Sequence, residues 1–181
     1  MNRERRAVFL DRDGVINRKA PDGDYVKNWK EFEFLPNVAE AIRMLNQAGF
    51  KVIVTTNQRG IALGLMTEEN LEEIHQRMAA ELEKGNAHID KIYYCPHEKN
   101  SCSCRKPEIG MFLQAKKDYP SISFPDSFVI GDTISDMEAG RALSCKCIII
   151  NKNSSVAILD VWYHNATSLY NAVNKYIVPR G

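Results

Sequence analysis

The chain has 181 residues, a formal net charge of +1, 44% hydrophobic and 26% charged residues. These values are typical of an ordinary globular protein, and we expect a single domain over residues 1–181. The near-neutral charge argues against nucleic acid as a partner, and no apolar stretch is long enough to span a membrane. Residues 1–6 are charged rather than apolar, so we expect no signal peptide and a cytoplasmic location, where thiols stay reduced.

Short apolar segments alternate with segments of helical periodicity along the chain. We expect strands at 7–10, 52–54, 89–94, 128–130 and 147–150, with a short edge strand at 161–163. We expect helices within 36–49, within 67–85, and at 109–117, 134–143 and 167–176. This alternation predicts right-handed β-α-β units and therefore an α/β fold with a doubly wound parallel sheet. The polar segment 17–33 is long for a connection, and we expect it to cover a functional site.

The first expected strand runs directly into Asp11-Arg12-Asp13-Gly14. Because side chains alternate along an extended chain, the two carboxylates should point to the same side, and Gly14 permits a sharp turn beyond them. Two like charges this close repel each other, and they are retained where a cation holds them or where catalysis needs both. Taken alone, the motif is also compatible with a solvated turn.

Polar clusters also follow the next three expected strands. They are Thr56-Asn57-Gln58-Arg59, a Cys/His cluster leading into Arg105-Lys106, and Asp132 with Asp136 one helical turn further on. In an open α/β sheet, ligands bind outside the carboxyl ends of the strands, so we expect all of these clusters to meet. Each cluster alone could be an ordinary capped turn, but together they predict one site with several functional groups.

Together these groups fit phosphoryl transfer, which needs a nucleophile, positive charge around the phosphoryl oxygens and a proton for the leaving alkoxide. Asp11 can attack phosphorus and form an aspartyl-phosphate. Asp13 can protonate the leaving group and then accept a proton from the hydrolytic water. The Thr56 hydroxyl and the Lys106 ammonium can bind the transferring oxygens.

A magnesium site is expected beside the nucleophile. We assign its ligands to Asp11, Asp132 and Asp13, the last through its carbonyl oxygen, because Mg²⁺ prefers oxygen ligands and offsets the charge between an anionic nucleophile and an anionic phosphate. Asp136 is expected to act at this site directly, or indirectly by orienting Lys106 or a metal-bound water.

A second metal site is expected in residues 95–104. Cys95, His97, Cys102 and Cys104 offer three thiolates and one imidazole within ten residues, which matches a closed tetrahedral zinc site. No ligand position remains for substrate, so zinc should be structural and should fix the following Arg105-Lys106. The alternatives are a disulfide, which a reducing compartment disfavours, or thiols with no common role. His75 falls on an amphipathic helix and is expected at its surface or boundary.

The ordered set Asp11/Asp13, Thr56, Lys106 and Asp132/Asp136 resembles the signatures of the haloacid-dehalogenase-like phosphatases over nearly the whole chain. The resemblance implies a Rossmann-like fold, here without a separate cap domain, and Mg²⁺-dependent hydrolysis of a phosphate monoester. The Cys/His loop before Lys106 is similar to the branch that contains sugar bisphosphatases and histidinol-phosphate phosphatases.

Within this branch we favour a small phosphorylated sugar, specifically a sugar bisphosphate, as the substrate of a monomeric enzyme. The residues expected to contact the substrate are Arg12, Asn17, Tyr25, Asn57, Gln58, Arg59 and Arg105. The alternatives are histidinol phosphate or another small phosphomonoester. A polynucleotide 3′-phosphatase is disfavoured by the near-neutral charge. A non-catalytic zinc-stabilised interaction module is disfavoured because Asp11, Asp13, Lys106 and Asp132 are all present.

Overall fold

The computed structural model describes residues 6–151 and 162–178. The strands are β1 (Ala7–Leu10), β2 (Lys51–Asn57), β3 (Lys91–Cys95), β4 (Phe128–Gly131), β5 (Lys146–Ile150) and β6 (Tyr163–Ala166). The α-helices are α1 (Val38–Gln47), α2 (Glu68–Lys84), α3 (Gly110–Asp118), α4 (Ile134–Ala142) and α5 (Leu169–Ala172). Short helical turns η2 (Trp29–Glu31), η3 (Phe124–Asp126) and η4 (Val173–Ile177) complete the described elements.

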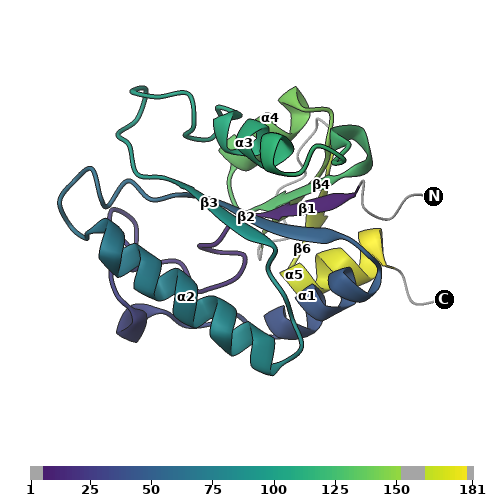
Figure 1. Cartoon of the computed structure of the whole chain (residues 1–181), viewed down its shortest axis with the longest axis horizontal. Helices are drawn as coiled ribbons and strands as arrows, with labels where there is room; N and C mark the ends of the chain where they lie inside the picture. Colours follow the sequence, from purple (N-terminus) through teal and green to yellow (C-terminus); the bar gives the residue numbers. More distant parts are fainter. Residues whose placement is uncertain (1–5, 152–161, 179–181) are drawn as a thin grey trace.

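The strands form one parallel six-stranded sheet in the order β3-β2-β1-β4-β5-β6. Helices α3 and α4 cover one face, whereas α1, α2 and α5 lie against the other (Figure 1). This confirms the expected α/β fold with a doubly wound sheet. Because β1 lies between β2 and β4, the strand order reverses there, and such a switch point opens a crevice at the carboxyl ends of the strands.

Both faces of β1 are buried, which explains its unbroken apolar run. Val8 and Leu10 belong to the core under α1 and α5, whereas Ala7 and Phe9 belong to the core under α3 and α4. All four side chains are fully buried. The strand is therefore fixed from both sides up to the residue that precedes Asp11.

The boundaries differ from the expected ones mainly at three places. Strand β2 continues to Asn57 rather than ending at residue 54, so Thr56 and Asn57 pair with β3. The edge strand lies at Tyr163–Ala166 instead of 161–163, and residue 161 is outside the described residues. The final helix is divided at Ala172 into α5 and a turn of π-helix, η4.

Two segments stand over the carboxyl ends of the strands: residues 12–35 after β1 and residues 96–109 after β3. The first is closed on itself, because Asn17 bridges to both Asp13 and Phe34. Within the described residues, no further folded unit covers this edge. None of the described helices is both long and apolar enough to cross a membrane. The single domain over 1–181 stays a prediction, because that range exceeds the described residues.

Candidate active site

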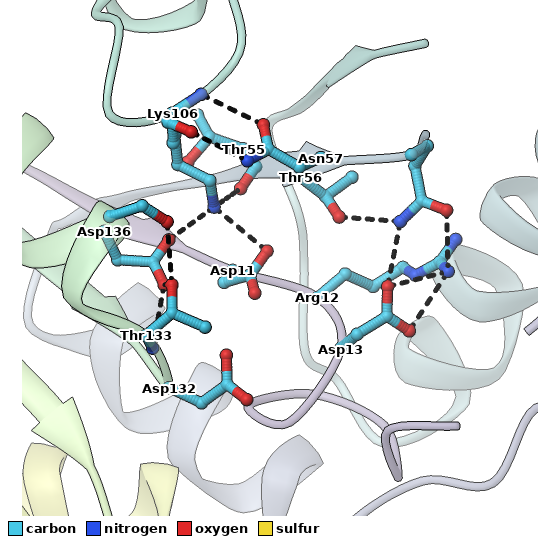
Figure 2. Close-up of polar contacts among 12 residues, drawn as sticks. Asp11, Arg12, Asp13, Thr55, Thr56, Asn57, Lys106, Asp132, Thr133 and Asp136 are labelled. Atoms are coloured by element: carbon cyan, nitrogen blue, oxygen red, sulfur yellow. Dashed lines mark hydrogen bonds and ion pairs between the residues drawn. The ribbon is translucent and has the colours of Figure 1, made fainter. Parts of the chain in front are cut away.

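The carboxyl ends of β1, β2 and β4 meet at a cavity of about 200 Å³. Asp11, Asp13, Thr56, Lys106 and Asp132 all line this cavity, as the sequence predicts (Figure 2). The backbone N–H of Asp11 donates to Ile130 O at 2.9 Å, so the ladder between β1 and β4 continues as far as the first carboxylate. The floor of the cavity is thus built by the sheet itself.

Lys106 is the buried cation of this floor, with a side chain only 2% exposed. Its Nζ lies 3.0 Å from Asp11 Oδ1 and 2.5 Å from Asp136 Oδ1, and it donates to Thr55 O at 2.6 Å. Asn57 fixes the Lys106 backbone in both directions, accepting from its N–H at 3.0 Å and donating to its carbonyl at 3.1 Å. Asn57 therefore holds the lysine in place.

The Asp11 and Lys106 side chains influence each other strongly. Burial raises the pKa of Asp11 to about 7; the Lys106 ammonium opposes this shift, whereas Asp136, Asp132 and Asp13 add to it. Burial alone would lower the pKa of Lys106, but the Asp11 and Asp136 carboxylates outweigh it and raise that pKa. The ammonium therefore stays charged where a phosphoryl oxygen would need it.

Asp13 is held on three sides by buried residues. Arg12 Nη2 donates to both carboxylate oxygens at 3.1 and 3.0 Å, Asn17 Nδ2 donates at 2.9 Å and Gln58 Nε2 donates at 2.8 Å. Burial raises the pKa of Asp13, but the Arg12 charge and these hydrogen bonds outweigh it, so the pKa is lowered. Arg12, Asn17 and Gln58 were expected to contact substrate, but they lie behind Asp13 and are at most 1% exposed. Gln58 Nε2 also donates to Thr56 Oγ1 at 2.8 Å.

His75 lies behind Arg12 and is a contact that the sequence analysis missed. It was expected at a surface or boundary, but it is only 8% exposed, and its Nε2 lies 3.2 Å from Arg12 Nη1. Burial, followed by the Arg12 charge, lowers the pKa of His75 to about 3. A signal was available: His75 follows Leu71 by four residues and precedes Met78 by three, which places it on the apolar stripe of α2.

Asp132 supplies the clearest indication of a cation site. Its Oδ1 is buried and has no hydrogen-bond partner among the described residues, whereas Oδ2 accepts from Lys19 Nζ at 3.0 Å. Gly14, with φ of +90°, permits this approach, since a Cβ there would lie 2.4 Å from Asp132 Oδ2. Carboxylate oxygens of Asp11, Asp132 and Asp136 lie within 4.8 Å of one another. An unpartnered buried oxygen among carboxylates suits a hard cation such as Mg²⁺.

Asp136 already has partners in the chain for both oxygens. Oδ1 pairs with Lys106, while Oδ2 accepts from the Thr133 N–H at 3.1 Å and from Thr133 Oγ1 at 2.6 Å. This capping box begins α4 and fixes the carboxylate. The arrangement favours the indirect role for Asp136, in which it orients Lys106.

The Cys/His loop brings its four ligand atoms together. Cys95, His97, Cys102 and Cys104 offer ligand atoms within 4.8 Å of one another, with separations of 3.0 Å between the Cys95 and Cys104 sulfurs and 3.2 Å between His97 Nδ1 and Cys104 Sγ. The three cysteines are free thiols rather than disulfides. This donor set, placed one residue before Arg105, fits a structural zinc ion.

The other residues expected to contact the substrate do not all reach the cavity. Tyr25 and Arg105 line the cavity, and Arg105 Nη1 is buried with no hydrogen-bond partner in residues 6–151 and 162–178. Arg59 instead forms an ion pair with Glu98 of the Cys/His loop and is not among the residues lining the cavity. Lys19, which the sequence analysis did not single out, does line it.

The fold and this set of carboxylates, lysine and threonine define a haloacid-dehalogenase-like phosphatase. The family model described as polynucleotide kinase 3 phosphatase matches residues 7–163, most of the chain. The chain therefore belongs to this family of haloacid-dehalogenase-like phosphatases.

Individual relatives are named more specifically. A Mycobacterium bovis protein named D-glycero-alpha-D-manno-heptose-1,7-bisphosphate 7-phosphatase is 36% identical over 180 residues, which cover 96% of this chain and 94% of the relative. An Escherichia coli protein with the corresponding beta name is 42% identical over 146 residues, covering 76% and 75%. The D,D-heptose 1,7-bisphosphate phosphatase from B. bronchiseptica, solved with magnesium and phosphate, superposes with a TM-score of 0.84 at 29% identity and covers 94% of this chain and 96% of its own.

Proposed function

We propose that this protein is a Mg²⁺-dependent phosphatase that removes the C7 phosphate of D-glycero-D-manno-heptose 1,7-bisphosphate through an aspartyl-phosphate. The observation that carries the proposal is the Asp11 carboxylate at the end of β1, with Lys106 at 3.0 Å and Asp13 in the same cavity. The names of the relatives support the sugar bisphosphate. The family description refers to a polynucleotide, but the net charge of +1 does not favour that substrate.

In the first step, an Asp11 oxygen attacks phosphorus and the bond to the sugar oxygen breaks. Lys106 Nζ and Thr56 Oγ1 bind the transferring oxygens, and Lys106 is already oriented by Asp136. Asp13 gives its proton to the leaving alkoxide. The entering phosphate raises the pKa of Asp13, because a second negative charge beside a carboxylate favours its protonated form.

In the second step, water attacks the phosphorus of the aspartyl-phosphate and restores Asp11. Asp13 is now a carboxylate and accepts the proton from that water. Its ion pair with Arg12 and its hydrogen bonds from Asn17 and Gln58 stabilise this ionised form. The same group thus serves as acid and then as base.

Asp11 and Asp132 would hold Mg²⁺, with the Asp13 carbonyl as a further ligand and Asp136 acting through Lys106. When bound, Mg²⁺ supplies positive charge that offsets repulsion between the nucleophile and the phosphate. The unpartnered Asp132 Oδ1 supports this assignment.

Recognition of the retained phosphate is assigned to Arg105 and Lys19, the two cations that line the cavity in addition to Lys106. Arg105 Nη1 has no partner in the described residues, so it can donate to a second anionic group. Tyr25 lines the same cavity and is placed to contact the sugar. Arg59 acts through its ion pair with Glu98, which joins the loop after β2 to the Cys/His loop.

Cys95, His97, Cys102 and Cys104 are proposed to hold one structural zinc ion. The converging donor atoms support the site, and reduced thiols, as in the cytoplasm, are required for it. Zinc would limit the freedom of the chain immediately before Arg105 and Lys106.

A substrate panel tests the proposed function. Phosphate release from both anomers of the heptose bisphosphate, from histidinol phosphate and from a 3′-phosphorylated oligonucleotide would be measured with Mg²⁺ and with excess chelator. The heptose bisphosphate should give the highest kcat/KM, and the chelator should abolish release. A preference for histidinol phosphate or the oligonucleotide would contradict the proposal.

A further inference from the structure

The Arg12 guanidinium is a permanently charged group that lies entirely inside the protein. It is 0% exposed and therefore needs partners for its donors. Nη2 contacts Asp13 and also Gln58 Oε1, the latter at 3.2 Å, whereas Nη1 lies 3.2 Å from His75 Nε2. In the part of the chain that the structure describes, Arg12 Nε has no hydrogen-bond partner, so the side chain cannot readily lose another.

The chemistry of this contact fixes the state of the histidine. A guanidinium only donates hydrogen bonds, so His75 Nε2 must accept, which requires a neutral ring with its hydrogen on Nδ1. His75 lies on the apolar stripe of α2 between Leu71 and Met78, both fully buried, and its ring centroid is 6.1 Å from that of Tyr94.

We propose that His75 is a positioning residue for Asp13. His75 Nε2 accepts from Arg12 Nη1, and this contact orients the other terminal nitrogen, Nη2, toward the Asp13 carboxylate. The inference rests on the proposed function, since it concerns the acid/base of that reaction. His75 is not among the residues that line the cavity, and within the described residues its side-chain hydrogen bond goes to Arg12 rather than to Asp13. It acts through Arg12, so helix α2 influences the orientation of Asp13, which protonates the leaving alcohol.

Removal of the acceptor has a specific expected consequence. Without His75 Nε2, Nη1 becomes a second unpaired donor on a buried charge, and the guanidinium moves toward another acceptor. Asp13 then loses the alignment that proton transfer needs. An alkyl phosphate requires that proton because its alkoxide is a poor leaving group, whereas p-nitrophenyl phosphate releases a phenolate that is stable without it.

A pair of variants with side chains of similar length separates positioning from packing. His75→Gln keeps an acceptor oxygen and His75→Met removes it, while Met78→Leu is a control on the same stripe of α2. We expect His75→Met to lower kcat/KM, which reports formation of the aspartyl-phosphate, roughly tenfold more for the sugar phosphate than for p-nitrophenyl phosphate; hydrolysis of the intermediate is common to both substrates. His75→Gln should restore kcat/KM for the sugar phosphate to within about threefold of wild type, and Met78→Leu should affect kcat/KM for both substrates equally.

Three outcomes would overturn the proposal. They are equal losses of kcat/KM on both substrates in His75→Met, wild-type activity in His75→Met, and failure of a folded His75→Gln to restore kcat/KM for the sugar phosphate. If His75→Met does not fold, the ¹⁵N resonances of the His75 ring in the wild-type protein decide: hydrogen on Nδ1 supports the contact, and hydrogen on Nε2 contradicts it. The spectrum tests the contact between His75 and Arg12 even if the wild-type protein hydrolyses none of the substrates. Such inactivity would refute the proposed function rather than this contact.

Discussion

Asp11 and Asp13 are two residues apart and line the same cavity, yet their surroundings shift the pKa values of the two carboxyl groups in opposite directions. Asp11 is paired with one shared lysine in a group of carboxylates, and its pKa is raised to about 7, mainly by burial. Asp13 receives donors from Arg12, Asn17 and Gln58, and its pKa is lowered. Figure 2 shows Lys106 and Asp136 on one side of Asp11, with Arg12 and Asp13 on the other.

The comparison shows how neighbours divide two tasks between chemically identical groups. Carboxylates outnumber cations around Asp11, so a bound cation is needed there. This arrangement suits a nucleophile that must react with an anionic phosphate. Around Asp13, the charge is already balanced inside the protein, which suits a group that exchanges protons. Environments that separate two carboxylates in this way commonly mark different catalytic roles.

The largest expected effect comes from removing the nucleophile. Asp11→Asn keeps the shape but cannot form the aspartyl-phosphate, so kcat should fall by at least about 10³-fold. Thermal unfolding should show an intact fold. Substantial turnover by this variant would contradict the assignment of different catalytic roles to the two carboxylates.

The surroundings of Asp11 also depend on the Cys/His loop. Cys102→Ser should remove zinc, lower the temperature of unfolding and reduce activity, because Lys106 follows the loop closely. Metal analysis of the wild-type protein should give about one zinc per chain. A zinc-free, fully active wild-type protein, or a disulfide among Cys95, Cys102 and Cys104, would contradict this dependence.

The surroundings of Asp13 can also be weakened at Gln58, whose Oε1 accepts from Arg12 Nη2 at 3.2 Å. Gln58→Met removes the donor that joins Asp13 Oδ2 to Thr56 Oγ1. We expect kcat/KM for the sugar phosphate to fall by roughly tenfold to a hundredfold, the scale of a hydrogen bond to a charged group. A loss below twofold would show that Arg12 and Asn17 suffice.

Cations at the mouth should affect specificity rather than either carboxylate. Arg105→Ala should lower kcat/KM for the sugar bisphosphate by roughly tenfold, and Lys19→Met by about two- to fivefold, with smaller losses on p-nitrophenyl phosphate. Lys30→Met is the matched control, since Lys30 lies in the same segment, is exposed and does not line the cavity. Equal losses on both substrates would place these residues in general catalysis.

The last expected effect is on stability in acid rather than on activity. His75 has a pKa of about 3 in the folded chain against 6.5 for the free group, so the unfolded chain takes up a proton first as the pH falls. Stability is therefore lost below about pH 6.5, by up to about 1.4 kcal/mol per pH unit. Between about pH 7.5 and about pH 5, wild type should lose about 2 kcal/mol more than His75→Gln in urea unfolding. Parallel losses would contradict burial of a neutral ring.

The sequence alone predicts the floor of the site because apolar runs determine the strands, and the strand ends determine where Asp11, Thr56 and Asp132 meet. It does not predict which polar neighbours face inward. Arg12, Asn17 and Gln58 were expected at the substrate, but side-chain directions in the turns after β1 and β2 point them at Asp13.

Long-range contacts between polar residues were equally hidden. Lys19 meets Asp132 across 113 positions, a contact that depends on the path of the 17–33 segment over the sheet. His75 lay on the apolar stripe of α2, but periodicity does not say what a buried histidine contacts. A charged partner such as Arg12 becomes visible only when the helix is packed against the end of β1.

The most direct test of the account is to look for the phosphoryl group on Asp11. The enzyme would be mixed with Mg²⁺ and the heptose bisphosphate, quenched in acid during turnover, digested and examined by mass spectrometry. The account predicts that the peptide containing Asp11 gains the mass of one phosphoryl group, and that Asp11→Asn shows no such gain. Phosphate release without phosphorylated Asp11 at any quench time, or the phosphoryl group on another residue, would contradict it.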